Sequence, residues 1–368
     1  MKINSTKKQK KVLVICPSPK GTAATQRFKY EQYLPLLEYE DFSFTISSFQ
    51  SNRLWKIIYQ PGRIVEKIVW VIFGYLVRIF DLIRSPFFDI VFINLWVTPL
   101  GPPVFERLLV LLNDRIIYDL DDMIFLHDQK EFGIIQFLKG KNKSLVLMQR
   151  ARIVIVCTPK LEEKALSLNR FKKVIDISST LDTQRFTVVK NYKKNAVTTI
   201  GWTGTHSTLP FLELIQPALV EISKKRPIKL LIIANHPFTM AGVPTEFLPW
   251  KEETEVEDLQ RIEIGVYPIP TNEWSLGKSS LKALTYMSVG IPVVATAYGT
   301  NFRVIDDSFS GFLVRDQNEW VTRIIALIDD LELRKKIGLA GRKKVEENFS
   351  IKANFPKYLQ AFNDVLKK

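Results

Sequence analysis

The chain has 368 residues, of which 46% are hydrophobic and 24% are charged, and its formal net charge is +14. This composition is typical of a globular protein, and the length is sufficient for two domains of ordinary size. Three histidines argue against a multi-histidine metal centre, and Cys16 and Cys157, each inside an apolar run, are interpreted as reduced core residues of a cytosolic protein.

The positive charge predicts a negatively charged partner: nucleic acid, anionic lipid or a phosphorylated substrate. Residues 1–11 are polar and basic, and they lack the apolar region of a signal peptide. No apolar run approaches the roughly 20 residues that a membrane-spanning helix needs. We therefore expect a cytoplasmic protein.

The chain opens with a strand, a loop of small residues and a helix. Residues 12–16 predict a buried strand, residues 17–25 a loop with Gly21 at its centre, and residues 27–37 a helix. This order is the first unit of a Rossmann-like domain. The loop does not read G-x-G-x-x-G, so it gives little support to a dinucleotide site.

The segment 53–84 is the most unusual one, and residues 68–77 contain no charge. On a helix over about 63–84, one narrow polar stripe lies opposite a wide apolar face. The stripe comprises Arg63, Lys67, Gly74, Arg78 and Asp81, and the apolar face contains Trp70, Phe73, Tyr75 and Phe80. Two interpretations stay open: a helix buried in the core, or a helix lying in a membrane interface with its basic residues at the headgroups and its aromatic residues beneath.

Three acids follow the strand predicted over residues 115–118. Asp119, Asp121 and Asp122 come after its carboxyl end, which is the edge of a parallel sheet where ligands bind. Acids so close together repel one another, which makes their protonation easy to tune. The alternative is a set of solvated loop acids or a helix N-cap.

The same order of elements restarts after a lysine-rich linker over residues 188–195. Residues 198–202 predict a strand, residues 203–207 a Gly/Thr loop, and the following residues a helix to about residue 224. Each half therefore begins with a strand, a small-residue loop and a helix. His206 lies in the second loop, where a histidine is either functional or merely solvated.

A second Gly-containing turn precedes the helix predicted from Leu281. Gly277, Lys278, Ser279 and Ser280 combine small residues, a cation and a possible N-cap serine. A helix N-terminus of this composition attracts phosphate, because its free N–H groups and the helix dipole point toward it. The alternative is an ordinary strand–helix–strand unit with a surface lysine.

Three stretches of this sequence resemble glycosyltransferase family 4, whose members have the GT-B fold. Residues 286–295, YMSVGIPVVA, resemble the end of the donor-site pattern E-A-M-A-x-G-x-P-V-V-A. Residues 117–122, IYDLDD, resemble the signature I-Y-D-x-D-D of one branch, and residues 27–35 resemble its R-x-x-x-E-x-Y-L-P run. The ribose-binding glutamate of the family falls at Thr285, and its partner falls near Gly277, so the two-glutamate motif is absent.

The resemblance implies an α/β protein of the GT-B fold, with two Rossmann-like domains facing a cleft. Residues 1–190 would form an N-terminal acceptor domain, and residues 196–350 a C-terminal donor-nucleotide domain. Residues 351–368 would form a helix that returns to the first domain. The likeness is strongest over residues 198–350.

The resemblance also implies transfer of a sugar, with retention, from a nucleotide-diphosphate sugar and without an essential metal or other cofactor. Lys278 would neutralise the diphosphate, Asp121 or Asp122 would orient or deprotonate an acceptor hydroxyl, and Arg27 would contact the acceptor. The residues expected to bind the donor are Gly21, Thr22, Gly204, Thr205, His206, Trp250, Gly277, Ser279, Ser280, Lys282 and Thr285.

The expected acceptor is a lipid-linked sugar or a growing cell-envelope polysaccharide. We expect the enzyme to be peripheral at the inner face of the plasma membrane, held by the helix at about 63–84. Because the paired glutamates are absent, a catalytically inactive nucleotide-sugar-binding scaffold is the alternative. A basic nucleic-acid-binding protein is a further alternative, but the sequence contains no recognised motif for it, and we expect no nucleic-acid partner.

Overall fold

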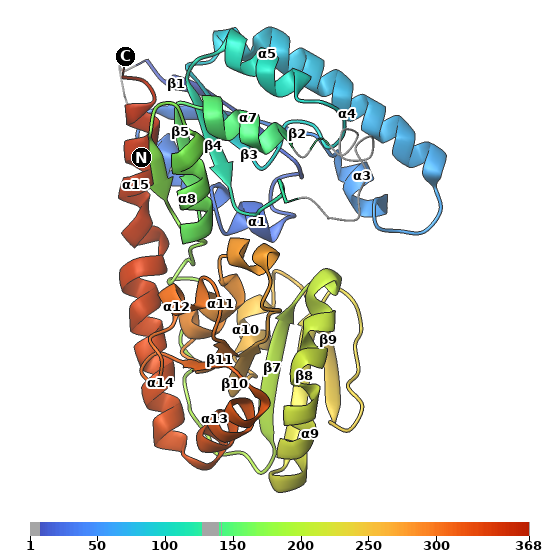
Figure 1. Ribbon diagram of the computed structural model, residues 1–368, viewed down its shortest axis with the longest axis vertical. Coiled ribbons are helices and arrows are strands. Elements are labelled where there is room, and N and C mark those ends of the chain that lie inside the picture. The colour runs from blue at the N-terminus through green and yellow to red at the C-terminus, as the bar shows by residue number, and fades with distance from the viewer. Residues whose placement is uncertain (1–7, 127–139, 141, 368) are drawn as a thin grey trace. The chain divides into compact units, whose positions relative to one another are not determined.

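The computed structural model describes residues 8–126, 140 and 142–367 (Figure 1). The chain divides into two compact units: Met1–Ser179 with Asn354–Lys368, and Thr180–Ala353. The last helix, α15 (Ile351–Asp364), therefore begins in the second unit and continues in the first. Within the described residues, no helix combines the length and the apolar character that crossing a membrane requires.

The first unit contains a six-stranded parallel sheet with the strand order β2-β1-β3-β4-β5-β6. Its strands are rich in Val and Ile, and most are buried on both faces, as expected for a parallel sheet covered by helices. The strands are β1 Lys10–Cys16, β2 Phe42–Ser48, β3 Ile90–Asn94, β4 Ile116–Leu120, β5 Ile153–Val156 and β6 Val174–Asp176.

The first predicted helix of the first unit is not continuous. The helix expected over residues 27–37 is divided into α1, a short 3-10 helix at Glu31–Tyr33, and α2. Pro35 explains the break, because it lacks an N–H and its ring clashes with the carbonyl four residues earlier. The α-helices are α1 Ala24–Arg27, α2 Leu34–Glu38, α3 Asn52–Ile57, α4 Ile64–Arg84, α5 Val104–Leu112, α7 Asn142–Arg150 and α8 Pro159–Leu168, with α15.

The helix expected at about 63–84 is present as α4, but its polar stripe points the other way. Gly74, Arg78 and Asp81 are buried, whereas most of the large apolar side chains of α4 are exposed. The apolar face is therefore not part of the core, and of the predicted polar stripe Arg63 is exposed and Lys67 is half-buried. The reason is that Arg78 and Asp81 satisfy each other, with Nη1 2.7 Å from Oδ2, and so can be buried together.

The second unit repeats the plan with a parallel sheet of order β12-β11-β10-β7-β8-β9. Its strands are β7 Thr198–Gly204, β8 Ile228–Ala234, β9 Thr245–Pro249, β10 Ile264–Tyr267, β11 Val293–Thr296 and β12 Phe312–Val314. Its α-helices are α9 Gln216–Lys225, α10 Glu255–Leu259, α11 Leu281–Ser288, α12 Asn301–Val304, α13 Gln317–Asp329 and α14 Leu331–Lys344. Both sheets agree with the predicted α/β class.

The loop after β7 leads into a ten-residue 3-10 helix, His206–Ile215, before α9 begins. The sequence predicts one helix here. Pro210 lies inside the 3-10 segment and cannot donate the backbone hydrogen bond that a continuous α-helix needs. The core of the unit lies between the sheet and helices α9 and α13, with Trp202, Leu219 and Ile324 fully buried.

Candidate functional site

The turn before α11 is pinned to the end of β11 by buried polar side chains. Ser280 adopts a left-handed conformation, with φ of 60°, and its hydroxyl lies 2.6 Å from Oδ1 of Asn301. The Asn301 amide donates in turn to the carbonyl of Thr296 at 2.8 Å. Ser280 occupies the N-cap position but makes no capping hydrogen bond to the first turn, because its hydroxyl is used by Asn301.

Two lysines gather at this end of α11. Nζ of Lys278 lies 3.5 Å from the ring centre of Trp274, and Nζ of Lys282 lies 4.7 Å from that of Trp202. Lys282 also donates to the hydroxyl of Thr208 at 2.9 Å. Burial, together with the charge of Lys278, lowers the pKa of Lys282 to about 7. An anion placed here would stabilise both ammonium groups and would raise the pKa of Lys282 again.

Gly204 makes room for this arrangement. A Cβ at this position would lie 2.5 Å from the Trp202 ring and 2.6 Å from Cε of Lys282. The next two residues, Thr205 and His206, are exposed. The hydroxyl of Thr205 lies 2.9 Å from that of Ser207, and the backbone N–H of His206 donates to Asn235 Oδ1 at 2.8 Å. The structure thus brings the loop after β7 against the N-terminal end of α11.

The other predicted donor residues of this unit are spread more widely. Gly277 is buried at the end of a 3-10 helix, Glu273–Gly277, and Ser279 is half-buried. Thr285 is 5% exposed, and its hydroxyl donates to the carbonyl of Leu281 in its own helix. Trp250 follows β9, where its indole N–H donates to Glu255 at 3.2 Å.

The opposite end of α11 is fixed by the segment that follows residue 180. The guanidinium of Arg342, on α14, donates to the carbonyls of Ser288, Phe186 and Thr183. The hydroxyl of Tyr192 donates to the carbonyl of Gly290 at 2.7 Å. The C-terminal carbonyls of α11 are therefore bound by groups that the sequence did not single out.

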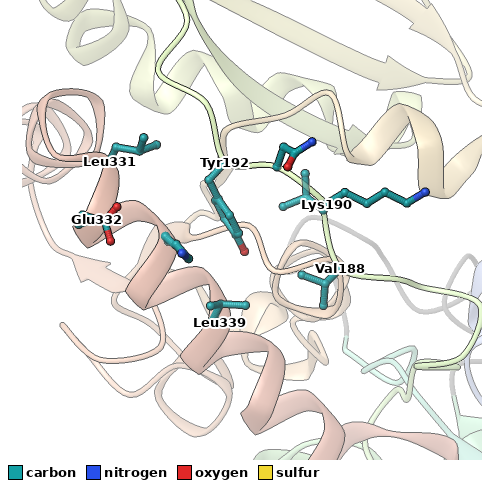
Figure 2. Close-up of a pocket in the computed structure, with 9 residues that line it drawn as sticks. Val188, Lys190, Tyr192, Leu331, Glu332 and Leu339 are labelled. Atoms are coloured by element: carbon teal, nitrogen blue, oxygen red, sulfur yellow. The ribbon is translucent and has the colours of Figure 1, made fainter.

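A cavity of about 380 Å³ lies beside this segment (Figure 2). Figure 2 shows the Tyr192 ring directed into the space between the segment and α14. Burial raises the pKa of Tyr192 to about 12. The lining contains no predicted site residue; it consists of Val188, Val189, Lys190, Asn191, Tyr192, Leu331, Glu332, Lys335 and Leu339.

In the first unit, the loop after β1 is organised by two buried side chains. The backbone N–H of Gly21, at φ of +80°, donates to Glu31 at 2.9 Å. The Gln26 amide bonds both to the backbone of Ser18 and to Glu31. Thr22 donates its hydroxyl to the carbonyl of Pro19. A glycine suits position 21 because other residues rarely adopt this φ.

Of the three acids predicted to follow the strand, Asp119 instead lies inside β4 and is buried in an ion pair, and only Asp121 and Asp122 come after the strand. Asp119 lies 3.1 Å from Nζ of Lys29, and both side chains are fully buried. The Tyr358 hydroxyl donates to Asp119 at 3.4 Å. Burial raises the pKa of Asp119, and the neighbouring ammonium of Lys29 limits that rise. The sequence analysis missed Lys29, although it lies two residues after Arg27 in the R-x-x-x-E-x-Y-L-P run.

The two acids named as catalytic candidates, Asp121 and Asp122, follow Asp119 by two and three residues. Asp121 is 9% exposed, and its carbonyl accepts the Cys157 thiol at 3.4 Å. Asp122 is half-buried, and its carboxylate accepts the N–H of Met123 at 2.8 Å. Arg27 is 9% exposed, with its guanidinium 5.0 Å from the Phe28 ring centre. Among the described residues, no group of three or more His, Cys, Asp and Glu side chains is arranged to hold a metal ion.

A smaller cavity, of about 170 Å³, lies past the end of β3. Nζ of Lys143 borders it and donates to Thr98 Oγ1 at 2.7 Å and to the carbonyl of Leu100 at 2.6 Å. Burial lowers the pKa of Lys143 to about 8. The sequence analysis did not select these residues; the lining is Trp96, Thr98, Pro99, Ile124, Gly140, Lys143 and Ser144.

The chain has the fold of GT-B glycosyltransferases, which confirms the predicted fold class. A glycosyltransferase from Rickettsia africae ESF-5 superposes with a TM-score of 0.69 and 16% identity, covering 98% of this chain and 99% of that structure. Sucrose-phosphate synthase from Thermosynechococcus elongatus superposes with a TM-score of 0.68 and 15% identity, covering 97% of this chain and 99% of that one. Anabaena Alr3699/HepE, solved with UDP and glucose, has a TM-score of 0.61 and 12% identity over 97% of this chain and 100% of that one.

Residues 198–330 match the family "Glycosyl transferases group 1", and this range contains Gly204, Lys278 and Lys282. Trehalose synthase of Pyrococcus horikoshii is 35% identical over 77 residues, which are 21% of this chain and 18% of that protein. Capsular polysaccharide biosynthesis glycosyltransferase CapM of Staphylococcus aureus is 26% identical over 166 residues, 42% of this chain and 43% of that protein. The chain aligns with less than half the length of these curated relatives.

Proposed function

We propose that the protein transfers a sugar, with retention, from a nucleotide-diphosphate sugar to an acceptor. The observation that carries this proposal is the pair Lys278 and Lys282 at the N-terminal end of α11, inside the glycosyl transferases group 1 domain. The reaction releases a nucleoside diphosphate, whose negative charge develops in the transition state. Two ammonium groups and the positive end of a helix neutralise that charge in place of a metal ion.

The remaining donor contacts follow from this position. Gly204 and Gly277 let the backbone approach the diphosphate closely, and the backbone N–H groups near Ser279 assist the lysines. Thr285 lies toward the ribose, and Trp250 toward the base. Two structural neighbours of the GT-B fold, Anabaena Alr3699/HepE and S. aureus TarM, were solved with UDP, and this supports uridine as the first base to test.

For the acceptor, we propose a lipid-linked sugar or a growing cell-envelope polysaccharide, at the cytoplasmic face of the plasma membrane. The curated relative CapM is named for capsular polysaccharide biosynthesis, which supports this class. Asp121 or Asp122 orients the acceptor hydroxyl or accepts its proton, and Arg27 contacts the acceptor. The cavity beside Trp96 offers an aromatic face and polar groups of the kind that a sugar ring contacts.

A panel of nucleoside diphosphates and nucleotide sugars in a thermal-shift assay tests the donor site. A ligand that binds the native state raises the melting temperature, and we expect UDP or a UDP-sugar to do so. Lys278→Ala should weaken that ligand by at least about tenfold, since one charge-assisted contact is lost. Lys224→Ala, at an exposed lysine of the same unit, is the matched control. If no nucleoside diphosphate binds, or if Lys278→Ala binds like wild type, the proposed site is wrong.

A catalytically inactive nucleotide-sugar-binding scaffold is the second candidate. It is favoured by the neutral, buried Thr285 at the position of the family's ribose-binding glutamate. Binding of a nucleotide sugar without release of nucleoside diphosphate, across a set of lipid-linked and polysaccharide acceptors, would support the scaffold over the enzyme.

A further inference from the structure

Helix α4 exposes a continuous apolar stripe along its whole length. The helix has 21 residues, which corresponds to about 30 Å. The large apolar side chains of the stripe are 47% to 76% exposed, and they are Ile64, Val65, Ile68, Val69, Ile72, Phe73, Leu76, Ile79, Phe80 and Ile83. A soluble monomer rarely leaves such a contiguous stripe in water, so the stripe marks a contact surface.

The neighbouring helix extends this surface. α5 packs against α4, and Figure 1 shows the two helices side by side in the first unit. The exposed apolar residues of α5 are Val104, Leu108, Leu111 and Leu112, with Leu111 75% exposed. We call the exposed apolar residues of α4 and α5 together the α4–α5 face. The face spans two helices, so it is wider than the apolar side of a single amphipathic helix.

The inner side of α4 fixes this orientation. Arg78 donates to Asp81, to the carbonyl of Val97 at 2.7 Å and to that of Cys16 at 2.8 Å. Asp81 also accepts the hydroxyl of Ser47 at 2.7 Å. Gly74 allows close packing, because a Cβ there would lie 2.8 Å from the backbone of Phe49. Rotating α4 to hide its apolar stripe would break every one of these buried contacts.

The charges around the face indicate what covers it. From α3 to the end of α5, the exposed charged residues are basic: Arg53, Lys56, Arg63 and Arg107. Asp114, just beyond α5, is an exposed acid and pairs with Arg152. Glu66 is less exposed and pairs with Arg53 and Arg63. A second copy of the chain would bring basic rim against basic rim in a two-fold dimer. An apolar centre with a basic rim matches an anionic bilayer, where acyl chains lie beneath negative headgroups.

We propose that the α4–α5 face docks onto an anionic lipid bilayer, with both helices lying in the interface and the basic rim at the headgroups. This inference rests on and deepens the membrane location proposed above, since it names the surface and the lipid charge. It differs from the sequence hypothesis, because the polar stripe of α4 holds the helix to the unit instead of facing the lipid. Docking does not depend on sugar transfer and can be tested without a donor.

Sedimentation of the full chain with vesicles tests the proposal. Wild type should bind phosphatidylglycerol-containing vesicles, should bind pure phosphatidylcholine vesicles more weakly, and should lose affinity in high salt. Ile72→Glu with Leu76→Glu should reduce affinity by at least about tenfold, since two apolar contacts become charged. Leu111→Glu tests the contribution of α5 and should reduce affinity several-fold. Phe309→Glu replaces a 61% exposed apolar residue of the second unit and should bind like wild type.

Each outcome separates this proposal from the donor site. The variants should keep the wild-type melting temperature and UDP response, which shows that they fold. Wild type that stays in the supernatant with anionic vesicles overturns the proposal, even if UDP still binds. A dimer that becomes monomeric in Ile72→Glu with Leu76→Glu would assign the face to a second copy instead. Vesicle binding without any nucleotide response would leave this inference standing and remove the proposed donor site.

Discussion

Lys282→Met should stabilise the fold while it cripples transfer. In the folded protein, burial and Lys278 lower the pKa of Lys282 from 10.5 to about 7, so the charged form is disfavoured. At about 1.4 kcal/mol per pKa unit, this corresponds to about 5 kcal/mol of lost stability at pH below 7. Lys282 keeps partial access to solvent, and methionine forfeits the hydrogen bond to Thr208. We therefore expect a net gain of about 1–3 kcal/mol.

The pH dependence identifies the cause of the gain. In the unfolded chain Lys282 is protonated up to about pH 10.5, whereas in the folded protein it loses its proton near pH 7. The loss of folding stability caused by the buried charge is therefore complete below pH 7, and it fades as the pH rises toward 10.5. The difference in melting temperature between Lys282→Met and wild type should shrink over this range. Donor affinity of wild type should fall above about pH 7, because binding then requires proton uptake, and the variant should lack this dependence.

Melting curves and donor titrations at several pH values measure both effects. Lys224→Met, at an exposed lysine of the same unit, should change neither quantity. The reasoning is refuted if Lys282→Met melts below wild type by the same amount at pH 6 and at pH 9. It is also refuted if the variant retains wild-type donor affinity, because Lys282 would then lie outside the diphosphate site.

Two further predictions concern buried networks, and urea unfolding measures both. Asp119→Asn leaves Lys29 buried without its carboxylate and should cost about 3–5 kcal/mol, whereas Lys29→Met with Asp119→Leu should recover most of that loss. An equal loss in the double variant would contradict the ion-pair explanation. In Arg342→Lys, the single ammonium group cannot reach the carbonyls of Thr183, Phe186 and Ser288 together. This variant should lose about 2–3 kcal/mol of unfolding free energy and should bind the donor more weakly. Glu346→Gln, at the half-exposed partner of Arg342, is the control and should be nearly neutral. A stable Arg342→Lys variant with normal donor affinity would show that α11 does not depend on this clamp.

The sequence predicted most strands of the two sheets because they are short, mainly apolar runs, such as residues 12–16 and 153–156, whereas β2 and β9 were not predicted. It also predicted the turn before α11, because a glycine, a lysine and serines next to a periodic helix form a local pattern. Such local patterns can be recognised in the sequence without knowing which distant residues come into contact.

The parts that escaped prediction depend on contacts between distant residues. Lys29 and Asp119 are 90 positions apart, and only the fold of β1, β4 and their loops brings them to 3.1 Å. The low pKa of Lys282 requires Trp202 and Lys278 around it. The periodicity of α4 gave its two faces correctly, but it did not reveal which face packs inward. The inward face is fixed by hydrogen bonds to the polar stripe. Arg78 donates to the carbonyls of Cys16 and Val97, and the Ser47 hydroxyl donates to Asp81.

The α4–α5 face and the lysine pair share one physical feature. Each lowers the stability of the ligand-free protein, so that a substitution removing the unfavourable group would raise it. An apolar face in water and a buried lysine near a second lysine are both unfavourable, and a ligand that covers the face or neutralises the charge relieves the cost. The two ligands differ in kind, since one removes apolar surface from water and the other neutralises charge. Their effects on melting temperature should therefore respond oppositely to variants: Ile72→Glu with Leu76→Glu should abolish stabilisation by vesicles and leave that by UDP, and Lys278→Ala should do the reverse.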